Sequence, residues 1–559
     1  MRKLERNLSV LSKKEYDLVI IGAGMFGVSA AWEAVSRGLS VAIIDKGDFI
    51  GATSANHFKM AHGGIRYLQH GDIPRVRESC RERSALLRIA PHLVKPLPIV
   101  IPTYGHGMKG KAFLGAGVVI YDFLTLDRNR GIQESRMISG GRFMSRREVI
   151  ELFPGIERNK LTGGVVFCDG QIYNSHRLGL AFLRAAVEAG VDSANYVEVC
   201  SFLTSKSRIN GIKARDILSG EEFEIRATMV LNTAGPWAHR LLESQLGLEI
   251  NPRPTFSRDL AFVVKRKARH DYGIAFLTKT KDVDTLIDVG GRHLFAVPWR
   301  EYTLIGVWHR VYEGSPDEII VTEDEMQGFV NEVNSAFPSM EVSLDDILMI
   351  NTGLTLFGSM DDQIDNNLSF GKRSRLIDHA KEHGLEGILT LIGVRATMAR
   401  GMASKAIDII DDRLNRQKTR SKTSKTPIWG GDFHAIDDLI VDAKRESPKE
   451  LTPEIIDALI YNYGSKFKEI LKYTNENPGW MKPLGDSTVL EAEIIHAVRE
   501  EMAQKLTDVV FRRTELGSGG YCDEDALQRS AKLVAEELGW TEERSKQEMK
   551  ETKQVFPQF

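Results

Sequence analysis

Residues 54–72, SANHFKMAHGGIRYLQHGD, place two glycines between a histidine and an arginine. An imidazole such as that of His62 titrates close to neutral pH and can act as a general base. A guanidinium such as that of Arg66 binds anions through charge-assisted hydrogen bonds. The alternative is a histidine with a structural role far from any chemistry. The ligand of this segment has to be inferred from the elements around it.

The N-terminal region has the pattern of a dinucleotide-binding βαβ unit. Residues 17–21, DLVII, are expected to form a buried parallel strand, and Gly22, Gly24 and Gly27 follow in G-x-G-x-x-G spacing before an apolar-periodic helix. Such glycines allow a tight turn, close approach of a pyrophosphate and packing of helix on strand. The next strand, SVAIID, ends at Asp45, where an acidic side chain accepts ribose hydroxyls. The sequence thus predicts a dinucleotide site.

The segment after the second strand decides between NAD and FAD. An NAD enzyme would continue with further βαβ units, whereas residues 46–68 show no such alternation. Two later strands run into glycine-containing turns, within residues 227–241 (ATMVLNTAGPWAHRL) and 387–410 (GILTLIGVRATMARGMASKAIDII). We therefore predict FAD, bound to a discontinuous nucleotide domain that has other material inserted.

Together these motifs resemble the FAD-dependent glycerol-3-phosphate dehydrogenase family, within the wider group of D-amino-acid-oxidase-like flavoproteins. The resemblance runs over nearly the whole chain. Its segments include the glycine motif at 22–27, KMAHGGIRYL at 59–68, LLRIAPHLVKPLP at 86–98, NTAGPW at 232–237, LIYNYGSKF at 459–467 and AVREEMAQKLTDVVFRRTELG at 497–517.

The resemblance implies which residues contact FAD. These are Gly22, Gly24, Gly27, Asp45, Thr53, Ser54, His62, Gly63, Gly64, Val197, Ala234, Gly235 and Thr397. It implies that the backbone of Val197 meets the adenine. It also implies that the segment from His62 to Gly64 passes beside the flavin ring, where only small residues permit close approach, and that Arg66 projects into the substrate cavity. Nothing in the sequence demands a covalent link to the flavin.

Three positions depart from the family pattern. Thr355, in MINTGLTLFGS, stands where the family has the substrate-facing arginine of a Gly-x-Arg-Pro motif. Arg395 replaces the lysine of a Gly-Gly-Lys-Leu-Thr-Thr turn, and Trp308 and His309 replace a Thr-Asp pair. Loss of one arginine removes about 1.5–3 kcal/mol from phosphate binding, or roughly tenfold to a hundredfold in affinity. These departures favour an altered substrate over glycerol 3-phosphate itself.

The predicted substrate-binding residues are Arg66, Tyr67, Trp308, His309, Arg310, Thr355 and Arg395. Their cations suit a phosphate or carboxylate. A tryptophan beside an imidazole suits a sugar or polyol, although a tryptophan in a strand is more often part of the core. For catalysis, His62 or His309 would accept the hydroxyl proton. Arg66 and Arg395 would hold the anionic end and stabilise negative charge on oxygen.

We therefore predict a dehydrogenase that oxidises a secondary alcohol of a phosphorylated or otherwise anionic polyol or sugar, by hydride transfer to flavin N5. Its electrons would pass to a quinone or another acceptor. Three alternatives stay open: glycerol-3-phosphate dehydrogenase itself, a flavin oxidase of an amine or hydroxy acid, and a flavin-binding sensor with a decayed pocket. No metal is predicted, because the sequence has no H-E-x-x-H or clustered Cys/His motif.

Composition narrows the partners and the location. The formal net charge of −2 at pH 7 argues against nucleic acid. Four cysteines without C-x-x-C spacing favour a reducing, cytoplasmic setting. No stretch approaches the ~20 apolar residues of a membrane span. Residues 105–124, GHGMKGKAFLGAGVVIYDFL, could lie on the inner face of a membrane, but a loop followed by a buried strand or helix is favoured.

The predicted fold is α/β, with a discontinuous Rossmann-like FAD-binding domain, an inserted antiparallel-sheet substrate domain and an all-α C-terminal domain. We expect the FAD-binding domain over 1–85, 155–249 and 346–410, the substrate domain over 86–154 and 250–345, a linker over 411–430 and the helical domain over 431–559. The Lys- and Arg-rich linker should be exposed. Arg512 and Arg513 are expected on a solvent-exposed helix face, and a homodimer is compatible with the helical domain.

Overall fold

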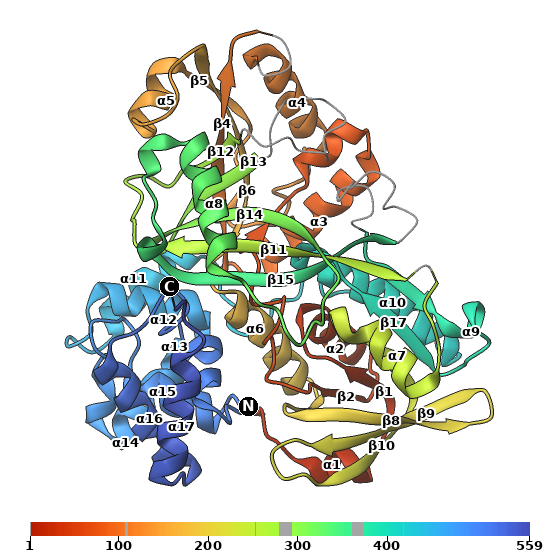
Figure 1. The fold of residues 1–559 in the computed structure, drawn as a ribbon. Coiled ribbons are helices and arrows are strands. Elements are labelled where there is room, and N and C mark those ends of the chain that lie inside the picture. The colour runs from red at the N-terminus through yellow and green to blue at the C-terminus, as the bar shows by residue number, and fades with distance from the viewer. Residues whose placement is uncertain are drawn as a thin grey trace.

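The computed structural model describes residues 2–106, 110–251, 253–278, 293–359, 373–417 and 419–558. Two β-sheets with flanking helices and a group of C-terminal helices make up this part of the chain (Figure 1). The strands that pair in each sheet come from widely separated parts of the sequence. Both sheets are therefore assembled from discontinuous segments.

The first sheet contains the nucleotide-binding strands. Its members are β1 (Glu15–Ile21), β2 (Val41–Ile44), β7 (Asp192–Ala194), β8 (Val197–Ser205), β9 (Arg208–Asp216), β10 (Glu222–Asn232), β16 (Arg375–Asp378) and β17 (Ile388–Ile392). The order is β16-β17-β10-β1-β2-β7, with β8 and β9 joined through β10. β1 pairs in parallel with β2 and β10, and β10 pairs in parallel with β17. The three strands expected to lead into glycine turns are thus adjacent, which confirms the discontinuous nucleotide domain.

Helices cover both faces of this sheet. They are α1 (Leu8–Lys13), α2 (Met25–Ser36), α6 (Ser175–Glu188), α7 (Ala238–Leu246) and α10 (Ala399–Arg413). Leu18 and Ile20 of β1 share a core with α2, α6 and α10. Val19 and Ile21 point the other way, into a core that includes residues of α1 and α7. A strand buried on both faces explains the continuous apolar run DLVII.

The second sheet is mostly antiparallel. Its strands are β3 (Met60–Ala61), β4 (Val94–Tyr104), β5 (Arg142–Ser145), β6 (Leu161–Ile172), β11 (Pro254–Val264), β12 (Gly273–Leu277), β13 (His293–Trp299), β14 (Tyr302–Tyr312) and β15 (Ile347–Ser359). The order is β15-β11-β14-β13-β12-β4-β6-β3, and β5 pairs with β6. The other helices of the two-sheet part are α3 (Ile73–Ile89), α4 (Lys111–Leu124), α5 (Arg146–Leu152), α8 (Glu323–Ala336) and α9 (His379–Glu382).

Two strands lie in the second sheet although the predicted boundaries place them in the FAD-binding domain. β6 pairs with β4, beginning with Ile172 opposite Val94. β15 pairs with β11, beginning with Ser359 opposite Pro254. The structure therefore differs from the expected boundaries at 155 and 346. Strand composition does not reveal a partner that is distant in sequence, and the partner determines the sheet.

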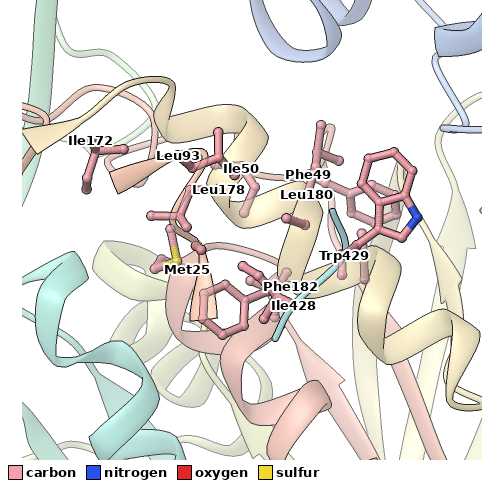
Figure 2. Packing of buried hydrophobic residues seen from close by; sticks show 14 of the residues in the cluster. Met25, Phe49, Ile50, Leu93, Ile172, Leu178, Leu180, Phe182, Ile428 and Trp429 are labelled. Carbon is pink, nitrogen blue, oxygen red and sulfur yellow. The ribbon is translucent and has the colours of Figure 1, made fainter. Parts of the chain in front are cut away.

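The C-terminal helices share a hydrophobic core with the nucleotide domain. They are α11 (Ile436–Glu446), α12 (Pro453–Tyr463), α13 (Phe467–Leu471), α14 (Tyr473–Glu476), α15 (Glu491–Arg499), α16 (Glu524–Leu538) and α17 (Glu542–Lys553). Figure 2 shows Ile428 and Trp429 packed beside Phe182 of α6. The Trp429 N–H donates to the carbonyl of Ala181 at 3.4 Å. The predicted exposed linker is therefore wrong in part, because Thr423, Ile428 and Trp429 are buried.

Buried ion pairs also join the helical region to the nucleotide domain. Asp48 Oδ2, in the loop after β2, lies 2.7 Å from Arg512 Nε and 2.6 Å from Arg513 Nη1. Arg177 Nη1 of α6 lies 2.6 Å from Glu501 Oε2. The predicted solvent-exposed position of the two arginines is wrong, since their side chains are 16% and 0% exposed. A carboxylate from a distant loop permits this burial by pairing with both charges.

Candidate cofactor and substrate site

Residues of both sheets line a cavity of about 1400 Å³. Its lining includes Ile21 of β1 and Leu391 of β17 from the first sheet, and Phe295 of β13 from the second. The predicted site residues that line it are Gly22, Gly24, Asp45, Thr53, Ser54, His62, Gly64, Tyr67, Val197, Ala234, Gly235, His309, Thr355, Arg395 and Thr397. Predicted residues up to 375 positions apart in sequence, Gly22 and Thr397, thus meet in one cavity large enough for a dinucleotide together with a small ligand.

The glycine motif has the backbone geometry that its spacing predicts. Gly22 has φ +95°, and a Cβ there would lie 2.8 Å from the carbonyl oxygen of Thr233. Gly27 does not line the cavity; a Cβ there would lie 1.9 Å from the carbonyl oxygen of Gly22, so this glycine lets α2 pack on the β1 turn. Gly24 lines the cavity as the N-cap of α2. The positive end of a helix dipole therefore faces the cavity, where a pyrophosphate would bind.

Asp45 lies at the end of β2 and is held in place by backbone donors. Its carboxylate accepts the N–H of Ala23 at 2.7 Å and that of Gly47 at 2.9 Å. Burial raises the pKa of Asp45, and these two hydrogen bonds oppose that effect. The backbone N–H of Val197 donates to the carbonyl of Asp45 at 2.8 Å, which brings the start of β8 beside the acidic residue. The arrangement suits adenosine, with the carboxylate on the ribose hydroxyls.

Two further residues support the fit of the cofactor. Ser54 Oγ accepts the N–H of Met25 at 2.9 Å in the first turn of α2, and Thr53 Oγ1 accepts the N–H of Leu354 at 3.1 Å. Thr397 Oγ1 is buried at the cavity wall and has no hydrogen-bond partner among the residues that the structure describes. Buried hydroxyls are almost always satisfied. A polar group of a bound cofactor would satisfy this one.

Only one of the paired glycines at 63 and 64 faces the cavity, whereas both were expected to permit close approach of the flavin. His62 and Gly64 line the cavity, but Gly63 does not. A Cβ at Gly63 would lie 2.0 Å from the Tyr121 hydroxyl and 2.5 Å from Arg83 Nη1. The Gly63 N–H donates to Asp169 Oδ1 at 2.6 Å. Packing against a buried cluster behind the cavity wall is therefore the reason for glycine at position 63.

His309 has a carboxylate partner on the neighbouring strand. His309 of β14 lies directly opposite Asp259 of β11, and Nδ1 is 2.7 Å from Asp259 Oδ1. Both residues line the cavity. A carboxylate that accepts the Nδ1–H of a histidine fixes its tautomer and orients Nε2 as a proton acceptor. The pair has the geometry of a general base and its orienting acid.

A cationic group lies around Tyr67. The Tyr67 ring centre is 4.0 Å from Arg75 Cζ and 4.7 Å from Arg395 Cζ. Burial lowers the pKa of Arg395 from its ordinary value. Arg395 Nη1 donates to Ser79 Oγ at 3.2 Å, and Nε is buried without a partner among the described residues. The planar, rigid guanidinium suits recognition of a carboxylate or phosphate.

Two predicted substrate residues point away from the cavity. Trp308 is buried in the core, where it stacks on Phe329 with ring centres 5.2 Å apart. Arg310 is half exposed, and its Nη1 lies 3.2 Å from Glu325 Oε1. Assigning them to the substrate site is therefore wrong. Alternate residues of a strand face opposite sides, so His309 enters the cavity and its two neighbours do not. The side chain of Arg66 lies outside the described residues, and its role stays a prediction.

Several cavity residues were missed in the sequence. They are Asp259, Arg75, Arg373, Lys505, Thr507 and Arg512. Arg373 Nη2 lies 2.8 Å from Asp72 Oδ2, next to the cationic group. No short motif surrounds Asp259, whose partner is 50 positions away. Only the alternation of β11 and β14 together with their register could have indicated that pair.

Two family models match the chain. The model described as FAD dependent oxidoreductase matches residues 17–399. The model described as the C-terminal domain of alpha-glycerophosphate oxidase matches residues 421–545. The first match covers more than half of the chain, and the two together span the sheets and most of the helical region.

The relatives with similar sequences include glycerol-3-phosphate dehydrogenases. The chain is 29% identical over 558 residues to the glycerol-3-phosphate dehydrogenase of Synechocystis sp., covering 96% of each protein. It is 27% identical over 515 residues to the aerobic glycerol-3-phosphate dehydrogenase of Staphylococcus haemolyticus, covering 90% of this chain and 87% of the relative. The structure of the glycerol-3-phosphate dehydrogenase from Bacillus halodurans complexed with FAD has a TM-score of 0.75 at 22% identity, and the match covers 98% of this chain and 95% of that one.

The glycine turn, the carboxylate of Asp45 and the unsatisfied hydroxyl of Thr397 agree with the family match. The chain belongs to the FAD-dependent oxidoreductase family, and FAD is its cofactor.

Proposed function

We propose that this enzyme oxidises a secondary alcohol of a phosphorylated or otherwise anionic polyol. One juxtaposition carries the proposal: the Asp259–His309 pair and the guanidinium of Arg395 line the same cavity as the FAD-binding glycines. When bound, FAD supplies the hydride acceptor. Relatives named as glycerol-3-phosphate dehydrogenases support a small anionic polyol as the substrate class.

His309 receives the hydroxyl proton of the substrate. As the C–H bond breaks, its electron pair leaves with the hydride, and the O–H proton passes to His309 Nε2 while the carbonyl forms. The Asp259 carboxylate, 2.7 Å from Nδ1, stabilises the resulting imidazolium. We assign the base to His309 because of this pair. His62 also lines the cavity and is the alternative.

Arg395, with Arg75 and Arg373 nearby, would bind the anionic end of the substrate. Burial disfavours the charged form of Arg395, and an incoming phosphate or carboxylate would offset that cost. Thr355, on β15, also lines the cavity and brings no charge. Because the cavity holds this neutral residue at the position of the family arginine, we favour an anionic polyol that relies less on that contact than glycerol 3-phosphate does.

An anaerobic titration of the bound flavin tests the proposal. Rapid loss of flavin absorbance is expected with glycerol 3-phosphate and other phosphorylated or carboxylated polyols, and only much slower loss with the uncharged polyols. Bleaching by amines alone would indicate an amine oxidase. Failure of every polyol, hydroxy acid and amine would indicate a non-enzymatic flavin protein.

Histidine variants then identify the base. His309→Ala should slow flavin reduction by about 10²–10⁴-fold, the usual contribution of a general base. His62→Ala tests the alternative base. His434→Ala is the control, because His434 is exposed and does not line the cavity. If His309→Ala reduces its flavin at the normal rate and His62→Ala does so slowly, His62 is the base instead.

We also propose that α4 docks on an anionic lipid surface. The helix buries Gly115, Val118 and Tyr121 and exposes Phe113, Val119, Ile120 and Phe123 on its outer side. Figure 1 places α4 at the far end of the molecule from the C-terminal helices. None of the described helices is long and apolar enough to cross a bilayer. An apolar helix face of this kind can lie within the interface instead.

Basic residues at the start of α4 and on the strand beside it support lipid as the occupant. Lys111 Nζ lies 5.6 Å from the ring centre of Phe143, which is 51% exposed and continues the apolar patch. The adjacent Arg142 is also exposed. Cations that border an apolar face suit anionic headgroups. Docking there would bring the enzyme to a quinone dissolved in the bilayer as electron acceptor.

Co-sedimentation with phosphatidylglycerol-containing vesicles tests this surface. Ile120→Ser together with Phe123→Ser should abolish binding, while Val441→Ser, at an exposed valine of α11, should leave it unchanged. If the double variant binds vesicles normally but loses a dimer in analytical ultracentrifugation, the patch contacts a second copy of the chain instead.

A further inference from the structure

The C-terminal helical region contributes three residues to the cavity. They are Lys505, Thr507 and Arg512, whereas every other lining residue lies between positions 21 and 397. The residues Asp508–Arg513 form a π-helical turn. Such turns are rare and occur frequently at functional sites.

These residues lie at the adenosine part of the cavity. Arg512 Nε is 2.7 Å from Asp48 Oδ2, three positions after Asp45. Lys505 Nζ is 5.6 Å from the ring centre of Tyr196. Tyr196 directly precedes Val197, whose N–H bonds the carbonyl of Asp45 at 2.8 Å. The ribose and adenine of FAD belong next to Asp45, so the C-terminal residues border them.

Buried polar contacts hold this wall in place. The Tyr196 hydroxyl donates to Asp508 Oδ1 at 2.6 Å. Asn195 Nδ2 donates both to Asp48 Oδ1 at 2.8 Å and to the carbonyl of Met502 at 3.1 Å. Arg513 Nη2 donates to Asp48 Oδ1 at 2.7 Å. Moving the C-terminal segment away would leave several buried polar groups unsatisfied, so these contacts favour the docked arrangement.

Lys505 is the member best suited to contact a ligand directly. It is half buried at the cavity surface, and no carboxylate among the described residues forms an ion pair with it. An ammonium offers three donors to phosphate or ribose oxygens and is attracted to the face of an aromatic ring. Arg512, by contrast, already pairs with Asp48 and Asp508.

We propose that the C-terminal helical region forms one wall of the adenosine half of the FAD site, with Lys505 as a direct ligand of the dinucleotide. FAD binding and docking of the helical region are then thermodynamically coupled, because the cofactor binds the docked arrangement. The inference concerns only the cofactor. It holds or fails independently of the substrate.

Binding titrations of the full-length apoprotein provide the first test. The probes are FAD and ADP, since ADP carries the adenosine part alone. Lys505→Ala should weaken both ligands by about tenfold, the usual effect of losing a charge-assisted hydrogen bond. Lys550→Ala, at an exposed lysine in the last turn of α17, should bind both ligands as the wild type does. Equal affinities of the two variants for both ligands would overturn the role of Lys505.

Hydrogen exchange in the unaltered protein provides a second test. Saturating ADP should protect backbone amides in peptides covering residues 501–515, and riboflavin should not. Unchanged exchange in these peptides with ADP would overturn the proposed wall. This measurement uses no variant and no substrate, so its outcome depends neither on folding of a mutant nor on the proposed alcohol oxidation.

Discussion

Asp259 and His309 face each other across the β11–β14 strand pair, with Oδ1 of the carboxylate 2.7 Å from Nδ1 of the imidazole. Ser257 Oγ donates to the same carboxylate oxygen at 2.8 Å. Both contacts help to fix the Asp259 side chain. The resemblance places an acidic residue at position 309, and here the carboxylate lies on the neighbouring strand instead. A carboxylate and an imidazole therefore lie side by side at this wall of the cavity.

Asp259→Asn should slow flavin reduction by about 10²–10⁴-fold with little change in KM, because a neutral amide neither fixes the imidazole tautomer nor stabilises the imidazolium. Anaerobic stopped-flow spectroscopy measures the rate. Ser257→Ala removes only one hydrogen bond to the carboxylate and should slow flavin reduction by less than about tenfold. A normal reduction rate in Asp259→Asn would show that the pair is structural.

Arg395→Gln should raise KM for the anionic substrate by about tenfold to a hundredfold, as expected for loss of a charge-assisted contact worth about 1.5–3 kcal/mol. The internal control is the uncharged analogue of the same polyol. Its much weaker turnover should be the same in both proteins, because it has no anion to bind. An equal loss with charged and uncharged compounds would instead indicate a damaged flavin site.

Thr355→Arg should lower KM for glycerol 3-phosphate by about tenfold, since the substitution restores a guanidinium at a residue that lines the cavity. Steady-state kinetics with a dye acceptor measure the change. Thr355→Val changes polarity without adding charge and should leave KM for this substrate unchanged. If arginine and valine have the same effect, position 355 does not face the anion.

Asp48→Asn should destabilise the protein by about 3–5 kcal/mol, because it leaves two largely buried arginines without their shared carboxylate. Burial alone would raise the pKa of Asp48, but Arg513 and Arg512 lower it below its ordinary value. Urea unfolding measures the change. Asp442→Asn breaks an exposed ion pair with Arg445 and should lower the free energy of unfolding by less than about 1 kcal/mol. Similar costs for both variants would contradict a structural role for the Asp48 cluster.

Glu493→Gln should stabilise the protein at alkaline pH. Burial raises the pKa of Glu493 to about 8, although hydrogen bonds from the Leu490 N–H and the Tyr463 hydroxyl oppose the shift. The folded state therefore keeps a proton that the unfolded state releases above about pH 4.3. The contribution of Glu493 to the free energy of unfolding is complete below that pH and is lost as the pH rises to about 8.

Unfolding free energies of Glu493→Gln and the wild type should therefore diverge from about pH 4.3 to pH 8 and run parallel above it. The expected gain is on the order of a few kcal/mol at pH 8, because each pKa unit corresponds to about 1.4 kcal/mol. Glu454→Gln, at an exposed position in the first turn of α12, is the control and should show no such divergence. A constant difference at all pH values would mean that Glu493 is ionised in the folded protein.

Local sequence was enough to predict the geometry at the glycine turn. Gly22, Gly24, Gly27 and Asp45 act through local backbone geometry, and their spacing within one βαβ unit is enough to specify it. The helical character of the C-terminal region is equally local, since it follows from apolar periodicity. The apolar pattern also indicated three buried strands that the structure places side by side.

Which distant residues share the cavity depends on how the whole chain packs. Asp259 meets His309 through strand register, while Trp308 turns into the core because neighbouring strand residues face opposite ways. Lys505 lines the cavity because a buried ion-pair cluster docks the helical region there. Local sequence predicts periodicity and turns, but it does not indicate which distant strand or helix an element packs against. That pairing depends on the packing of the whole chain.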